Sequence, residues 1–79
     1  MCRYDDAKNY CKRNSLPLES GWVFFLLGET YFDKATPFAW SEMLPYVFQP
    51  FRVMAVCMET GEHVKAIGLG GRQKWEAVV

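Results

Sequence analysis

The stretch GWVFFLLGETYF, residues 21–32, decides what kind of fold this chain can adopt. Six consecutive apolar residues, 22–27, stand between two glycines, and two more aromatic residues follow closely. The run is short and rich in aromatic residues, which predicts a strand rather than a helix. It does not alternate between polar and apolar residues, so we expect a central strand with both faces covered. It is also far shorter than the ~20 residues that a helix needs to cross a bilayer, so we expect no membrane segment.

Further strands are predicted on both sides of this run. Gly28 and Glu29 favour a turn, after which residues 30–32 can pair back on the first strand. Residues 51–58 are mostly apolar and predict another strand, followed by a turn at 59–62 and an antiparallel return over 63–67. Gly61 supplies the positive φ that this turn needs. Residues 72–79 alternate, which predicts a half-exposed strand whose buried face carries Trp75 and Ala77.

A first helix is predicted over residues 5–14. Asp5 or Asp6 is expected to cap its start, and Lys12 and Arg13 complement the dipole at its end. One face is apolar and is expected to lie against the core. That face comprises Tyr4, Ala7, Tyr10 and Cys11.

A second helix is predicted to begin at Thr36-Pro37, where a capping hydroxyl precedes a proline at the first helical position. Its amphipathic stripe consists of Trp40, Met43, Leu44, Val47 and Phe48. Pro45 interrupts this stripe. Either the helix kinks at Pro45, or it begins late, near Ser41, so that the proline lies close to its first turn.

These elements predict one domain of the α+β class. Strands joined by hairpins favour a small, mainly antiparallel sheet of roughly three to five strands packed against two short helices. A chain of 79 residues is too short to build a second core. We therefore expect residues 1–79 to form a single domain.

Charge and cysteine usage restrict the function classes. Nine Lys and Arg residues balance nine Asp and Glu residues, so the chain lacks the basic excess of a nucleic-acid-binding protein. Nucleic acid is therefore an unlikely partner on charge alone. Cys2, Cys11 and Cys57 are an odd, widely spaced set, which favours reduced thiols in the cytoplasm over a disulfide framework. The polar N-terminal segment predicts no signal peptide.

No residue pattern in the chain predicts an enzyme, a cofactor site or a metal site. The single histidine, His63, has one plausible thiol partner, Cys57, across the predicted hairpin. If the loop is Thr60-Gly61, the two side chains point to opposite faces, whereas a three-residue loop with a bulge would bring them together. Two ligands are too few for a structural zinc site in either case. We therefore expect no catalytic residue, no metal and no cofactor.

Two basic and glycine-rich features are weaker pointers to a ligand. The segment GLGGR, residues 68–72, resembles a phosphate-binding loop, but a strand follows it where a helix is needed. A mobile contact loop is the better interpretation. Arg72, Lys74 and Trp75 combine charge with an aromatic ring, yet Trp75 falls on the opposite face from the two cations.

Thirteen aromatic residues are more than a domain of this size can bury completely. Residues near turns and helix ends are the best candidates for exposure, and aromatic, Met and Arg side chains are enriched at protein interfaces. The residues predicted to bind a partner are Tyr31, Phe32, Phe38, Tyr46, Phe51, Arg52, Arg72 and Lys74. The partner is expected to be another protein or a second copy of the chain, as in a homodimer.

The sequence thus predicts a non-catalytic, cytoplasmic protein-binding module. We expect a small stand-alone chain of the kind that phages and mobile elements carry, which inhibits a host complex such as a defence nuclease by steric occlusion. The alternative is a nucleic-acid-binding or transcription-linked regulatory module. Salt dependence separates the two, because binding to nucleic acid weakens steeply as salt rises.

Overall fold

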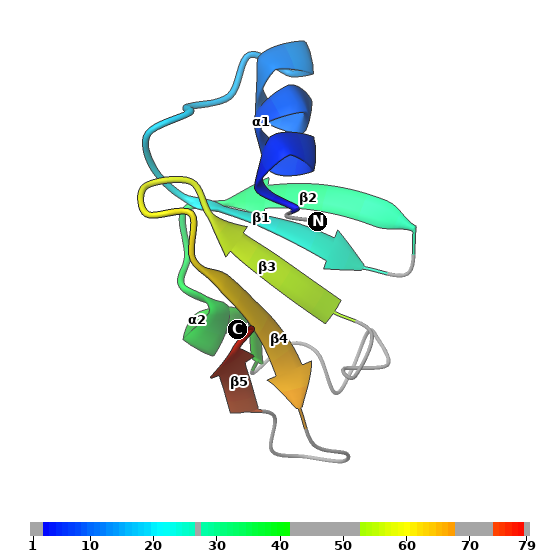
Figure 1. Ribbon diagram of the computed structural model, residues 1–79, viewed down its shortest axis with the longest axis vertical. Coiled ribbons are helices and arrows are strands. Elements are labelled where there is room, and N and C mark those ends of the chain that lie inside the picture. The colour runs from blue at the N-terminus through cyan, green and yellow to red at the C-terminus, as the bar shows by residue number, and fades with distance from the viewer. Residues whose placement is uncertain (1–2, 27, 42–52, 68–73, 79) are drawn as a thin grey trace.

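The computed structural model of the chain describes residues 3–26, 28–41, 53–67 and 74–78 (Figure 1). In chain order the elements are α1 (Tyr4–Arg13), β1 (Trp22–Leu26), β2 (Glu29–Asp33), α2 (Pro37–Ser41), β3 (Val53–Cys57), β4 (His63–Ile67) and β5 (Lys74–Ala77). The five strands form one antiparallel sheet in the order β2-β1-β3-β4-β5. The predicted α+β fold, with an antiparallel sheet and two short helices, is confirmed.

Strand β1 lies inside the sheet, between β2 and β3, as its unbroken apolar run predicts. Val23 pairs with Phe32 on β2 and with Val56 on β3. The next residue, Phe24, pairs with Tyr31 on β2 and points to the other face because side chains alternate along a strand. Val23 and Phe24 are both fully buried. Each face of β1 is therefore covered.

The two faces of the sheet carry separate buried clusters. One cluster joins Val23, Val56 and Met58 to the apolar face of α1, where Ala7 and Cys11 are fully buried. The other cluster lies on the opposite face, with Trp22 and Trp75 packed against its edge. Its buried members are Phe24, Leu26, Val53, Ala55, Val64 and Ala66. The sheet thus separates two small cores, which explains why β1 and β3 tolerate no polar residue.

Helix α1 begins one residue earlier than predicted and its start is not capped by a side chain. Arg3 occupies the cap position with helical dihedrals, φ −71° and ψ −4°. The prediction that Asp5 or Asp6 caps the helix is therefore wrong. Both acids lie inside the first turn, where they still complement the positive end of the helix dipole.

The turn between β3 and β4 is longer than either predicted loop. Val56 pairs with His63, and the N–H of Cys57 donates to the carbonyl of Glu62 at 2.8 Å. Gly61 has φ +78°, as predicted, and its N–H donates to the carbonyl of Cys57 at 2.8 Å. Cys57 and His63 therefore point to opposite faces. The two-residue loop Thr60-Gly61 was also expected to place these side chains on opposite faces. The strand register differs, however, from the registers expected for the two-residue and the three-residue loop.

Helix α2 begins at Pro37, the earlier of the two predicted starts, so the alternative start near Ser41 is wrong; the helix lies against β5. Beyond Ser41, the stripe predicted for this helix and the position of Pro45 lie outside the described residues, as does the Gly68–Gly71 loop. On β5, Trp75 packs against the second core, but Ala77 is exposed, which corrects the prediction that both are buried. Because β5 is an edge strand, the last residues of its inner face lie at the rim of the core.

Over the described ranges, no helix has both the length and the apolar character needed to cross a membrane.

Candidate binding site

The predicted partner-binding residues differ widely in exposure. Phe38 on α2 is the most exposed large apolar side chain among the described residues, at 75%, and Tyr31 on β2 is 38% exposed. Phe32 is instead half-buried and packs against the cluster beneath α1. The expectation that Phe32 is exposed is therefore wrong, because alternation along β2 turns its ring towards the core while Tyr31 faces outward.

The other predicted contacts are not placed by the structure. Tyr46, Phe51, Arg52 and Arg72 lie outside the described residues, and Lys74 begins β5 with its side chain outside them. The expected partner-binding roles of these five residues therefore stay predictions.

Phe38 is presented by a short, well-anchored turn of helix. Pro37 is buried beneath it, and the N–H of Ala39 donates to the carbonyl of Thr36 at 3.0 Å. The Thr36 hydroxyl Oγ1 also accepts from the N–H of Ala39, at 3.4 Å, as expected for a capping residue. A fixed backbone beneath an exposed ring lowers the entropy lost when that ring is buried by a partner.

Tyr31 lies on β2, at the edge of the sheet opposite to β5. Its hydroxyl donates to the carboxylate of Glu29, two residues earlier on the same strand. This hydrogen bond, more than burial, raises the pKa of Tyr31. The bond holds the ring along the edge strand, which gives this edge an aromatic side chain of fixed orientation.

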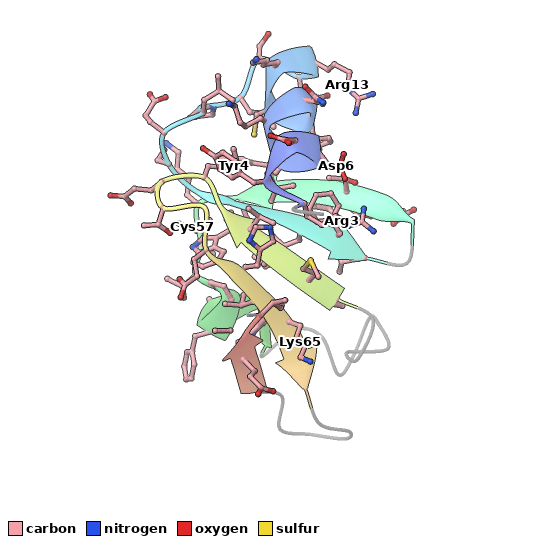
Figure 2. All side chains as sticks on the ribbon, viewed as in Figure 1. Arg3, Tyr4, Asp6, Arg13, Cys57 and Lys65 are labelled. Carbon is pink, nitrogen blue, oxygen red and sulfur yellow. The ribbon has the colours of Figure 1, made fainter. Side chains whose placement is uncertain are left out.

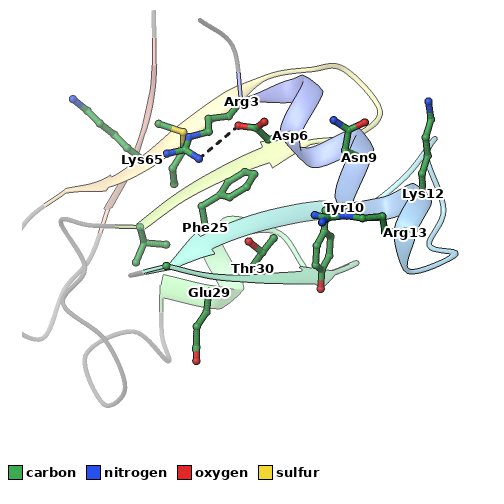
Figure 3. Close-up of a pocket in the computed structure, with 13 residues that line it drawn as sticks. Arg3, Asp6, Asn9, Tyr10, Lys12, Arg13, Phe25, Glu29, Thr30 and Lys65 are labelled. Atoms are coloured by element: carbon green, nitrogen blue, oxygen red, sulfur yellow. Dashed lines mark ion pairs between the residues drawn. The ribbon is translucent and has the colours of Figure 1, made fainter.

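A groove of about 1190 Å³ lies between α1 and the face of the β1–β2 hairpin that is turned towards this helix (Figure 3). Phe25 rises from β1 into it, and Tyr10 reaches down from α1 towards the sheet (Figure 3). The guanidinium of Arg3 lies over the Phe25 ring, 5.1 Å from its centroid. Thr30 lies on the floor beside Phe25.

Four of the nine Lys and Arg residues of the chain line this groove, although the chain as a whole is neutral. They are Arg3, Lys12 and Arg13 from α1 and its N-terminal end, and Lys65 from β4. Two acids, Asp6 and Glu29, also belong to the lining. The groove therefore concentrates positive charge that the total composition conceals.

The two acids neutralise little of this charge. Asp6 pairs with Arg3 at 3.6 Å, but the two side chains are 57% and 55% exposed, so the pair is weak. Glu29 points to the other side of the sheet, where it accepts from Tyr31 (Figure 3). Within the described part of the chain, Lys12, Arg13 and Lys65 have no ion-pair partner.

The structure separates the thiol and the imidazole that the sequence offers as a catalytic pair. Cys57 and His63 lie on opposite faces of the sheet, so the thiol cannot pass its proton to the imidazole. The described ranges also contain no group of three side chains suited to holding a metal ion. Figure 2 shows where Cys57 lies on β3.

The groove was not predicted from the sequence, although part of its pattern is visible there. Arg3, Asp6, Tyr10 and Arg13 follow one another at helical spacing, which places them on one face of α1. That polar stripe predicts only a solvated face. The contributions of Phe25, Thr30 and Lys65 come from strands, and only the tertiary structure brings them beside the helix.

Comparison of the chain with known protein families, with curated proteins and with solved structures found no match.

Proposed function

We propose that this chain is a non-catalytic protein-binding module that docks on its partner through the ring of Phe38. The observation that carries the proposal is the 75% exposure of this side chain on an anchored helical turn. Covering a large apolar side chain contributes about 1.5–3 kcal/mol, which makes Phe38 a suitable anchor for an interface. Tyr31 adds a second exposed ring at the β2 edge.

The separation of Cys57 from His63 on opposite faces of the sheet supports a module without thiol–imidazole chemistry. A module without chemistry of its own acts by occupying a surface. Steric occlusion of a protein complex in the cytoplasm, such as a host defence nuclease, is the form of this function that the sequence predicts for a phage accessory chain. A homodimer formed through the same ring is the simplest variant, since an exposed apolar side chain can be covered by a second copy.

The experiment is an affinity capture from the native host with the tagged chain and two variants. Phe38→Ser removes the proposed anchor, and Leu18→Ser removes a different exposed apolar side chain, 36% accessible, in the connection after α1. We expect a partner that the unmodified chain and Leu18→Ser retain and that Phe38→Ser loses. Sedimentation of the purified chain identifies the case in which the partner is a second copy.

Two outcomes would contradict the proposal. One is a partner captured equally well by Phe38→Ser, with circular dichroism showing that the variant is folded. The other is a partner that is released steeply as salt rises, because an apolar interface responds little to salt.

A further inference from the structure

The groove between α1 and the sheet has the charge and the surfaces of a ligand site, and it is separate from Phe38. Phe38 extends from α2, which lies on the other side of the sheet from α1 (Figure 3). The groove combines three cations that have no ion-pair partner among the described residues, Lys12, Arg13 and Lys65, with two partly buried rings, Phe25 and Tyr10. We propose that this groove binds a short segment of single-stranded nucleic acid.

The cations favour an extended anion over a single small one. Arg13 and Lys12 lie in the last turn of α1, Arg3 precedes its first residue, and Lys65 projects from β4. A helix of ten residues is about 15 Å long, so these charges are distributed along the groove rather than gathered at one point. Successive phosphates of one strand can each lie close to a different cation, whereas a single phosphate can contact only some of the cations.

The rings and polar groups favour nucleotides over an acidic peptide. Bases stack on aromatic rings and on guanidinium planes, and the groove offers the ring of Tyr10 and the guanidinium of Arg3, which itself covers the Phe25 ring. Thr30 and Asn9 line the same groove and offer hydrogen-bonding groups to base edges. Carboxylate side chains would use the cations but would leave these flat surfaces without a matching partner.

The concave shape favours a single strand over a duplex. Proteins read duplex DNA by inserting a helix or a β-ribbon into one of its grooves, which needs a convex, basic element. Here the cations surround a hollow whose floor is the sheet, so a strand with unpaired bases can enter where a duplex cannot.

The ion pair between Arg3 and Asp6 is weak enough for a phosphate of the nucleic acid to replace Asp6. An exposed pair at 3.6 Å contributes little free energy, so a phosphate can replace Asp6 as the partner of Arg3 at small cost. Asp6 then lies close to the strand and weakens its binding. Asp6→Asn is therefore expected to tighten binding.

The test measures the fluorescence anisotropy of a labelled oligothymidylate of about twelve nucleotides, titrated with the chain between about 25 and 200 mM NaCl. With three or four phosphates neutralised, log K should fall against log salt with a slope of about −2 to −3. Removing one cation at about 50 mM salt should weaken binding roughly fivefold to tenfold. We expect this loss for Arg13→Ala and for Lys65→Ala, and about a fiftyfold loss for the double variant.

Matched controls separate the groove from other charge and from Phe38. Lys34→Ala removes an exposed cation outside the groove and should leave the affinity unchanged. Phe38→Ser should also leave it unchanged, so failure of this test and failure of the proposed protein-binding function can be told apart.

Three results would overturn the inference. The first is no binding of the oligonucleotide at the lowest salt, and the second is an equal loss in Lys34→Ala, which indicates unspecific attraction. The third is a polyglutamate peptide of the same length that binds more tightly and depends on the same cations, which would assign the groove to an acidic protein segment.

Discussion

Gly21 precedes β1 at a point where a side chain would meet two separate obstacles. Its φ is +88°, a conformation that costs an L-residue about 1–2 kcal/mol. A Cβ at this position would also lie 2.4 Å from Cζ and 2.7 Å from Cε2 of Phe32. Gly28 has nearly the same φ, +91°, but a Cβ there has no atom within 4 Å. An alanine at position 28 would therefore suffer backbone strain alone, whereas an alanine at position 21 would suffer both backbone strain and steric overlap.

The cost of the overlap follows from the surroundings of Phe32. Its ring packs against the cluster under α1, which includes fully buried Val23 and Val56, so it cannot move away freely. The carbonyl of Gly21 accepts from the N–H of Met58 at 3.0 Å, which also holds the backbone in place. Overpacking of this kind costs about 1–3 kcal/mol. We expect Gly28→Ala to lose about 1–2 kcal/mol of unfolding free energy and Gly21→Ala about 2–5 kcal/mol.

Urea unfolding followed by tryptophan fluorescence measures this difference. A domain of this size has a stability of about 4–12 kcal/mol, so Gly28→Ala should retain a folded baseline, and Gly21→Ala should retain one if the parent stability exceeds about 5 kcal/mol. With an m-value of about 1 kcal/mol per molar urea, the midpoint of Gly21→Ala should lie about 1–3 M below that of Gly28→Ala. Phe32→Leu should remove the excess cost in a double-mutant cycle, because the smaller side chain vacates the contested space. Equal losses in the two glycine variants, or an excess that persists with Phe32→Leu, would refute the packing described here.

Two further predictions concern the two cores. Phe24→Ala should cost about 3–5 kcal/mol of unfolding free energy in urea, because Phe24 is fully buried and meets Trp75 edge-to-face at 6.1 Å; an unchanged midpoint would contradict this. Burial raises the pKa of the Cys11 thiol, so the unfolded chain releases this proton at lower pH than the native state does. Stability should therefore fall as pH rises above about 8.5, and Cys11→Ala should lessen that fall between about pH 8 and 10 in the same urea assay. An identical fall in both proteins would show that Cys11 does not contribute to it.

The sequence by itself determined the strands of this protein and two of their four pairings, β1 with β2 and β3 with β4. The unbroken apolar run of β1 required cover on both faces, and two cores on opposite sides of the sheet supply that cover. Gly61 and the alternation of residues 72–79 likewise predicted a turn and a half-exposed strand, because period and turn chemistry are local properties. The sequence also predicted the exposure of Phe38, since few neighbouring side chains can cover a large ring at a helix start close to a turn.

Only the tertiary structure decided which side chains meet. The register of the β3–β4 hairpin, and with it the separation of Cys57 from His63, depends on a loop length that several local sequences satisfy equally well. The basic groove depends on how α1 lies across β1 and β2, and it joins Arg13 to Lys65 across more than half of the chain. Neutral composition concealed this concentration of charge, because net charge records how many charges a chain has and folding decides where they gather.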